Sequence, residues 1–180
     1  GLGAIKGLGE GPVGNIIAAR SEGGPFKDMF DFCARVDGRK VNKRALEAMI
    51  RSGALDEIGP QGEIGFRRAV MLAGMDEAVK LAEQHARNTN SGMGDLFGDS
   101  IVDSASDINY NSYNGARTLS LRDRRNGEKD TLGLYLTGHP IDEYEDELKQ
   151  MVPHRIIDLR PGKESSAVSG MVVGMRIMKN

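Results

Sequence analysis

The chain has 180 residues with a formal net charge of −2, and 28% of its residues are charged while 39% are hydrophobic. This balance is typical of a soluble globular protein with one domain or two small ones. No apolar run approaches the roughly 20 residues of a membrane span, and no secretory signal is visible. The single cysteine, Cys33, excludes an intramolecular disulfide framework and fits a reducing cytoplasm, where we expect the protein to reside.

The first predicted elements are a short helix over 2–6 and a longer helix over 11–21, separated by a Gly-Leu-Gly turn. Pro12 suits the first turn of the second helix, where its missing N–H costs nothing. The period of the apolar residues gives that helix one buried stripe. The stripe consists of Val13, Ile16, Ile17 and Ala19.

This glycine-rich turn has two interpretations. Gly7, Gly9 and Gly11 allow positive φ and let another molecule approach the backbone closely. The turn would then present free N–H groups at a helix N-terminus with Lys6 beside them, which describes a helix-hairpin-helix that grips a nucleic-acid phosphate without reading bases. The alternative is a connector that only needs to turn tightly.

Two further helices follow, over 28–36 with Asp28 as its N-cap and over 42–52 with Asn42 as its N-cap. A second small-residue turn comes directly after them, so a pair of hairpins could straddle a duplex. Residues 1–54 hold nine Lys/Arg and six Asp/Glu, and the densest positive patch runs from Arg35 to Arg51. Such a patch fits weak DNA contact, although an ordinary solvated helix face has the same composition.

The next helical segment covers 63–88, with a break predicted at Gly74. Residues 88–118 are rich in Asn, Ser, Gly and Asp, which is typical of a linker or long loop. One Leu-Phe pair inside this segment could be a short peptide that docks in an apolar groove of a partner. The alternative is a loop whose Leu and Phe tuck back onto their own domain.

Helical periodicity resumes at 119–136 after an N-cap at Ser120 or Thr118, and Pro140 opens an amphipathic helix. The remainder of the chain is expected to form short extended segments, ending in a strand that lacks a partner. Because both ends look cut, we expect a piece of a longer protein. The predicted fold class is mainly α, with these segments: 1–90 as a tandem helix-hairpin-helix DNA-binding domain, 91–118 as a linker, 119–166 as a helical connector and 167–180 as a truncated β segment.

Four stretches resemble the alpha subunit of bacterial replicative DNA polymerase III. They are GLGAIKGLGEGPVGNIIAAR, GGPFKDMFDFCARVDGRKVNKRALEAMIRSGALD, the LFG loop and LGLYLTGHPIDEYEDEL. The resemblance implies tandem helix-hairpin-helix units on duplex DNA, then a sliding-clamp peptide, then the first strand of an OB-fold. It also implies a parent DNA-directed DNA polymerase whose catalytic carboxylates and Mg²⁺ site lie outside this chain, with other replicase subunits as further partners.

The resemblance assigns site residues in three groups. The first hairpin, expected to face double-stranded DNA, comprises Lys6, Gly7, Leu8, Gly9 and Gly11. The second hairpin and its supporting cations comprise Ser52, Gly53, Ala54, Lys40, Lys43 and Arg44. The clamp-binding peptide comprises Asp95, Leu96 and Phe97, and Met93 stands where the family usually has Gln, which removes a pocket hydrogen bond.

No catalytic or metal-binding constellation is predicted, and no cofactor is expected in this chain. The acidic residues of IDEYEDEL are spread around a helix, which favours a solvated face over metal chemistry. The histidines have no ligand spacing with Cys33, which we expect to be a core residue, and His139 before Pro140 is expected at a helix entry. The main alternative to a DNA grip is a structural scaffold that binds a partner through the Leu-Phe loop without DNA contact.

Overall fold

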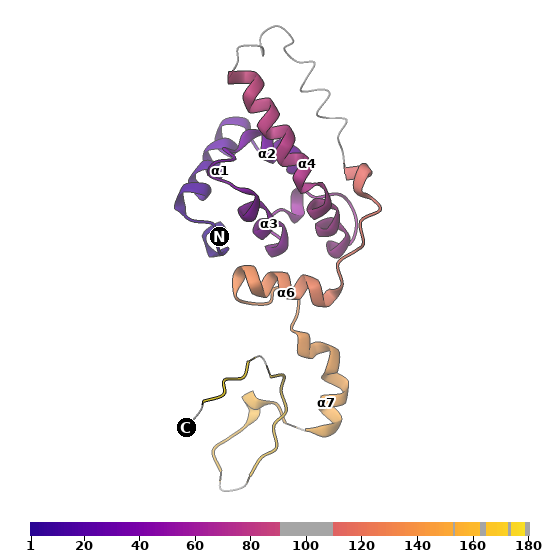
Figure 1. The fold of residues 1–180 in the computed structure, drawn as a ribbon. Helices are drawn as coiled ribbons and strands as arrows, with labels where there is room; N and C mark the ends of the chain where they lie inside the picture. Colours follow the sequence, from indigo (N-terminus) through magenta and orange to yellow (C-terminus); the bar gives the residue numbers. More distant parts are fainter. Residues whose placement is uncertain (91–109, 153, 163–164, 173, 179–180) are drawn as a thin grey trace. The chain divides into compact units, whose positions relative to one another are not determined.

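A computed structural model describes residues 1–90, 110–152, 154–162, 165–172 and 174–178. The chain divides into two compact units, Gly1–Leu136 and Thr137–Asn180, which are described separately (Figure 1). The described residues are mainly helical and contain no strand, which confirms the helical fold class. None of the described helices is long and apolar enough to cross a membrane.

The first unit is built from α-helices and short 3-10 turns. They are η1 (Leu2–Ala4), α1 (Glu10–Gly23), α2 (Met29–Arg35), α3 (Lys43–Ser52), η2 (Asp56–Ile58), α4 (Ile64–Asn90), η4 (Tyr110–Tyr113) and α6 (Leu121–Leu132). The predicted caps Asp28, Asn42 and Ser120 are confirmed, because each side chain accepts a backbone N–H from three residues further on. Each cap satisfies one of the N–H groups that a helix start leaves unbonded.

The core of the first unit lies where α2 and α3 pack on α4, and α6 packs along α3 (Figure 1). Its fully buried side chains include Met29, Phe32, Leu46, Met49, Ile50 and Met71. Phe26 meets Phe32 edge-on with 4.9 Å between ring centroids. A core of Met, Leu and Ile with few aromatic rings follows directly from the composition of the chain.

Cys33 lies in this core, as predicted, with 7% of its surface exposed. Burial, with a smaller contribution from Asp28, raises the pKa of its thiol from 9.0 to about 12. Since the thiolate is the reactive species, we expect native Cys33 to resist a disulfide reagent at pH 8 and to react once urea unfolds the chain. Fast reaction of the folded protein would contradict this.

The raised pKa of Cys33 also makes the free energy of unfolding depend on pH. The contribution to stability is fully present below about pH 9 and declines as the pH rises toward 12.

The predicted break at Gly74 is wrong, because α4 is continuous from Ile64 to Asn90. A Cβ at Gly74 would lie 3.0 Å from Cε2 of Tyr113, so this glycine lets η4 pack directly on the helix. The Tyr113 hydroxyl also donates to the Glu77 carboxylate one turn further on. The contacts of Tyr113 with this part of α4 compensate for the low helix propensity of glycine.

Two further sequence predictions need correction in the first unit. Ile17 is 47% exposed and does not share the buried stripe of α1 with Ile16. Helix α6 ends at Leu132 and not at Leu136, because Gly133 adopts the left-handed conformation (φ 80) and its N–H donates to the Lys129 carbonyl. A glycine in this position is a common way to end a helix.

The second unit begins with η5 (Pro140–Tyr144), α7 (Glu145–Met151) and η6 (Ile156–Asp158). His139 is a helix-entry residue as predicted, since its Nδ1 accepts from the Ile141 N–H. The acidic side chains that follow it are exposed, as predicted for a solvated face. The predicted terminal β segment forms no strand among the described residues of 167–180, because a lone extended segment has no neighbour to complete a ladder.

Candidate nucleic-acid interface

The first hairpin turn is held at both sides by buried apolar residues. Ile5 and Leu8 are each only 4% exposed, and the Leu8 N–H donates to the Ile5 carbonyl at 3.0 Å. Between them the side chain of Lys6 is exposed, and Gly7 takes a φ of 87° that favours glycine. The Leu8 side chain therefore anchors the turn from inside, while Lys6 and Gly7 form its outer surface.

The start of α1 is open to solvent. In the part of the chain that the structure describes, no acceptor is bonded to the N–H groups of Gly9, Glu10 and Gly11. Gly9 is the N-cap and supplies no side-chain oxygen, unlike the caps of α2, α3 and α6. Unbonded N–H groups and the positive end of the helix dipole make this turn able to hold an anion.

The glycines of this turn have different conformations and open surroundings. Of the three, only Gly7 has positive φ; Gly9 is extended (φ −80, ψ −178) and Gly11 is helical, so these two do not use the left-handed conformation that a glycine allows. A Cβ at any of the three positions would meet no atom within 4 Å. Close packing inside the protein therefore does not require Gly9 or Gly11, whereas the approach of an external group to the backbone would.

The electrostatic balance at this turn is modest. Lys6 contributes one exposed cation, and Glu10, in the first turn of α1, contributes an exposed carboxylate. The helix dipole adds roughly half a positive charge at the N-terminus. This arrangement fits weak, salt-sensitive binding of an anion.

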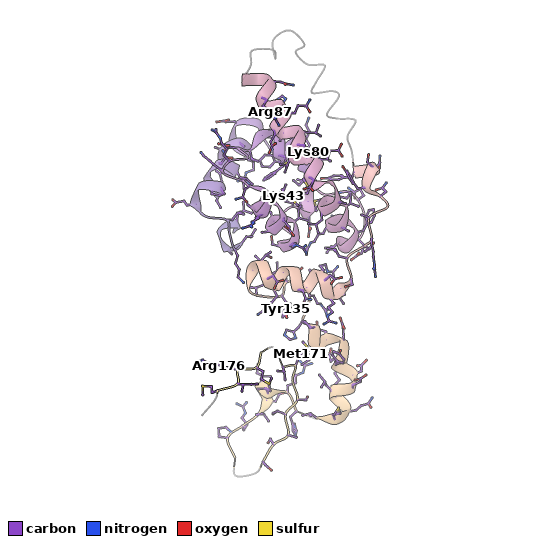
Figure 2. The ribbon with its side chains drawn as sticks, viewed as in Figure 1. Lys43, Lys80, Arg87, Tyr135, Met171 and Arg176 are labelled. Atoms are coloured by element: carbon purple, nitrogen blue, oxygen red, sulfur yellow. The ribbon has the colours of Figure 1, made fainter. Side chains whose placement is uncertain are left out.

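The basic patch predicted between Arg35 and Arg51 separates into inward and outward cations. Arg35 is turned inward, where its Nη2 donates to the carbonyls of Ala19 (2.7 Å) and Gly24 (2.8 Å) at the end of α1. Lys40 and Arg44 are exposed and form no ion pair within the described residues. Lys43 pairs with Asp76 of α4 (Lys43 is labelled in Figure 2).

Asn15 connects the outward part of this patch to the first hairpin. Its Oδ1 accepts the N–H of Asp37 at 2.8 Å, which fixes the loop before α3 against α1. Arg39 in that loop pairs with Asp37 at 3.2 Å, and the Arg39 backbone N–H lowers the pKa of the same carboxyl. Sequence reasoning missed the role of Asn15 and placed Arg35 in an outward basic patch, because the contacts of both residues join separate helices.

Comparison with known proteins finds a matching motif and similar relatives. A family model described as a helix-hairpin-helix motif matches residues 1–63. DNA polymerase III subunit alpha of Pseudomonas fluorescens is 54% identical over 189 residues, which cover all of this chain. The same subunit from Escherichia coli K12 is 41% identical over 99% of the chain. This chain is homologous to one region of DNA polymerase III subunit alpha. It spans only about 15–16% of the length of these relatives.

The second predicted hairpin of this alpha-subunit homologue differs from the first. It lies at the C-terminal end of α3, where the Gly53 N–H donates to the Ile50 carbonyl and the Ala54 N–H to the Met49 carbonyl. The buried Ser52 hydroxyl also donates to Met49. Gly53 has the left-handed conformation (φ 83) of a helix C-cap, and a Cβ there would lie 2.3 Å from Nη2 of Arg68, so backbone conformation and internal packing explain this glycine. DNA contact at Ser52, Gly53 and Ala54 stays a prediction, without the unbonded N–H groups of the first turn.

The predicted clamp-binding peptide lies in a segment that the structure does not describe. Met93, Asp95, Leu96 and Phe97 of the clamp-binding peptide lie outside the described residues. Within the described ranges, His, Cys, Asp and Glu side chains form no group able to hold a metal ion.

Proposed function

We propose that the first hairpin grips the sugar-phosphate backbone of duplex DNA inside a replicative DNA-directed DNA polymerase. The observation that carries the proposal is the open N-terminus of α1, whose N–H groups at Gly9, Glu10 and Gly11 have no acceptor in the described chain. The helix-hairpin-helix family match and the names of the relatives support it.

Contacts of this kind suit a polymerase because they are independent of sequence. Backbone N–H groups and Lys6 can reach phosphate oxygens but do not read base edges. The protein can therefore hold newly made duplex and slide along it. Exposed Lys40, in the loop that Asn15 of α1 holds, and Arg44, in the first turn of α3, are proposed to add supporting phosphate contacts.

We further propose that the segment containing Asp95, Leu96 and Phe97 tethers the polymerase to its sliding clamp. The proposal rests on the sequence resemblance alone. Its physical basis is multivalency, since a linked second site raises the effective concentration to roughly millimolar. Two weak attachments would then combine into processive replication.

A scaffold without DNA contact is the competing function. It requires the hairpin glycines to serve close helix packing, but Cβ positions at Gly9 and Gly11 have open space around them. The open glycines therefore favour the DNA grip.

The test is binding of the chain to a 20-base-pair duplex, followed by fluorescence anisotropy from low to moderate salt. With two to four phosphate contacts, log K should fall against log salt with a slope of about −2 to −4, and Kd should be roughly 10⁻⁴ to 10⁻⁶ M. Duplexes of different base composition should bind equally. Affinity that ignores salt, or a clear preference for one sequence, would contradict the proposal.

A further inference from the structure

The first hairpin is fixed in place by a helix that lies outside the matched motif. The family model covers residues 1–63, whereas α6 begins at Leu121. Yet the Lys6 N–H donates to the Thr131 carbonyl of α6 at 2.8 Å. The C-terminal end of α6 is therefore hydrogen-bonded to the turn that carries Lys6 and Gly7.

Lys129 lies on this end of α6 and is exposed. Its Nζ donates to the Gly133 carbonyl at 2.9 Å and lies 5.3 Å from the centre of the Tyr135 ring. These contacts hold the ammonium close to the end of the helix (Tyr135 is labelled in Figure 2). An ammonium has three donors, so this one keeps N–H groups for a further acceptor.

The Lys129 ammonium and the backbone of the turn that carries Lys6 are near enough to contact one strand of DNA. Lys6 is bonded to the carbonyl of Thr131, and Lys129 is bonded to that of Gly133, two residues further on. With about 3.8 Å between successive Cα atoms, the Lys129 ammonium lies within roughly 12 Å of the Lys6 backbone nitrogen. Phosphates of one strand follow each other about every 3.4 Å along the duplex axis, so a few nucleotides span this distance.

The helix that carries Lys129 is rigidly fixed. The neighbouring Glu128 is fully buried, and its Oε1 accepts from Nη1 of Arg68 on α4 at 3.0 Å. Its Oε2 accepts the Leu136 N–H at 2.8 Å, which also fixes the segment after Gly133. A cation on such a support is held in place before DNA arrives, which lowers the cost of ordering it.

We propose that Lys129 is a second phosphate-binding cation of the hairpin site, supplied by α6. This inference rests on the proposed DNA grip and extends it to a residue outside the helix-hairpin-helix motif. The duplex would then contact the turn at Lys6 and Gly7 and the end of α6 together.

The test compares duplex binding by the wild-type chain with Lys129→Gln across the same salt series. Loss of one phosphate contact should reduce the salt slope by about 1 and weaken binding about eightfold at 0.1 M salt. Lys129→Arg should restore binding, since it keeps the charge. Lys80→Gln is the matched control, because Lys80 is exposed on α4 and the charge change is identical (Figure 2).

Lys6→Gln in the same series separates this inference from the proposed function. If Lys6→Gln weakens binding while Lys129→Gln behaves like Lys80→Gln, the hairpin grip stands and the role of Lys129 is overturned. If the wild-type chain shows no salt-dependent binding, the proposed function fails and the inference fails with it. Unfolding midpoints of all variants should match that of the wild type, so that a loss of binding reports the contact and not the fold.

Discussion

Replacing Glu128 with alanine is expected to lower the free energy of unfolding by about 3–5 kcal/mol. The carboxylate is fully buried and pairs with Arg68, whose side chain is only 3% exposed. Removing it leaves a buried guanidinium with less compensation and leaves the Leu136 N–H without its acceptor. Asp56 remains 2.8 Å from Nη2 of Arg68, which places the expected loss toward the lower end of the range.

Urea unfolding followed by circular dichroism measures this loss. Asp76→Ala is the control, because it also breaks an ion pair between two helices but at an exposed site, where such pairs contribute about 0–1 kcal/mol. Glu128→Gln should give an intermediate loss, since the amide keeps one acceptor. If Glu128→Ala costs no more than Asp76→Ala, the buried pair is not a major source of stability.

The double change Lys6→Glu with Gly9→Asp is expected to weaken duplex binding by more than about 60-fold at 0.1 M salt. It replaces the exposed cation of the turn with a carboxylate and adds a second carboxylate beside it, and because both repel phosphate the loss should exceed that of two ionic contacts. Gly9 has φ −80 and ψ −178, an extended conformation that any residue adopts, and a Cβ there meets no atom within 4 Å. Aspartate is moreover a favourable N-cap, so the helix should be as stable as before or more so.

Fluorescence anisotropy with the same duplex measures this effect, and thermal unfolding verifies the fold. Lys80→Glu with Gly115→Asp is the matched control, because it makes the same charge change at an exposed lysine and at a glycine with open surroundings. If both double variants lose binding equally, the effect is one of overall charge. If the Lys6/Gly9 variant binds like the wild type, the first hairpin does not grip DNA.

Features decided within one or two helical turns were predictable from the sequence. Asp28, Asn42 and Ser120 cap their helices as expected, because a cap depends on the residues directly after it. The turn at Gly7 was predictable for the same reason. Gly74 was not, since the ring that covers it belongs to Tyr113, which lies across the α4 packing surface and far along the chain.

The candidate site was predictable in its residues but not in its surroundings. The sequence identified Lys6, Gly7 and the start of α1, whereas the contact of Lys6 with Thr131 joins positions separated by most of the first unit. The difference between the two hairpins was not predictable from the sequence either. Gly9 and Gly53 look alike in sequence, but only Gly53 has the Arg68 guanidinium packed against it.

The sequence by itself determined the helical class, the capped helix starts, the glycine turn before α1 and the similarity to DNA polymerase III subunit alpha. These depend on local backbone preferences and on short motifs, which require no knowledge of distant contacts. Only the tertiary structure decided that Arg35 turns inward, that Gly9 faces open space and that α6 supports the first hairpin. The physical reason is that burial and hydrogen bonding join side chains far apart in sequence, and hydrophobic periodicity shows which face of a helix is buried but not what covers it.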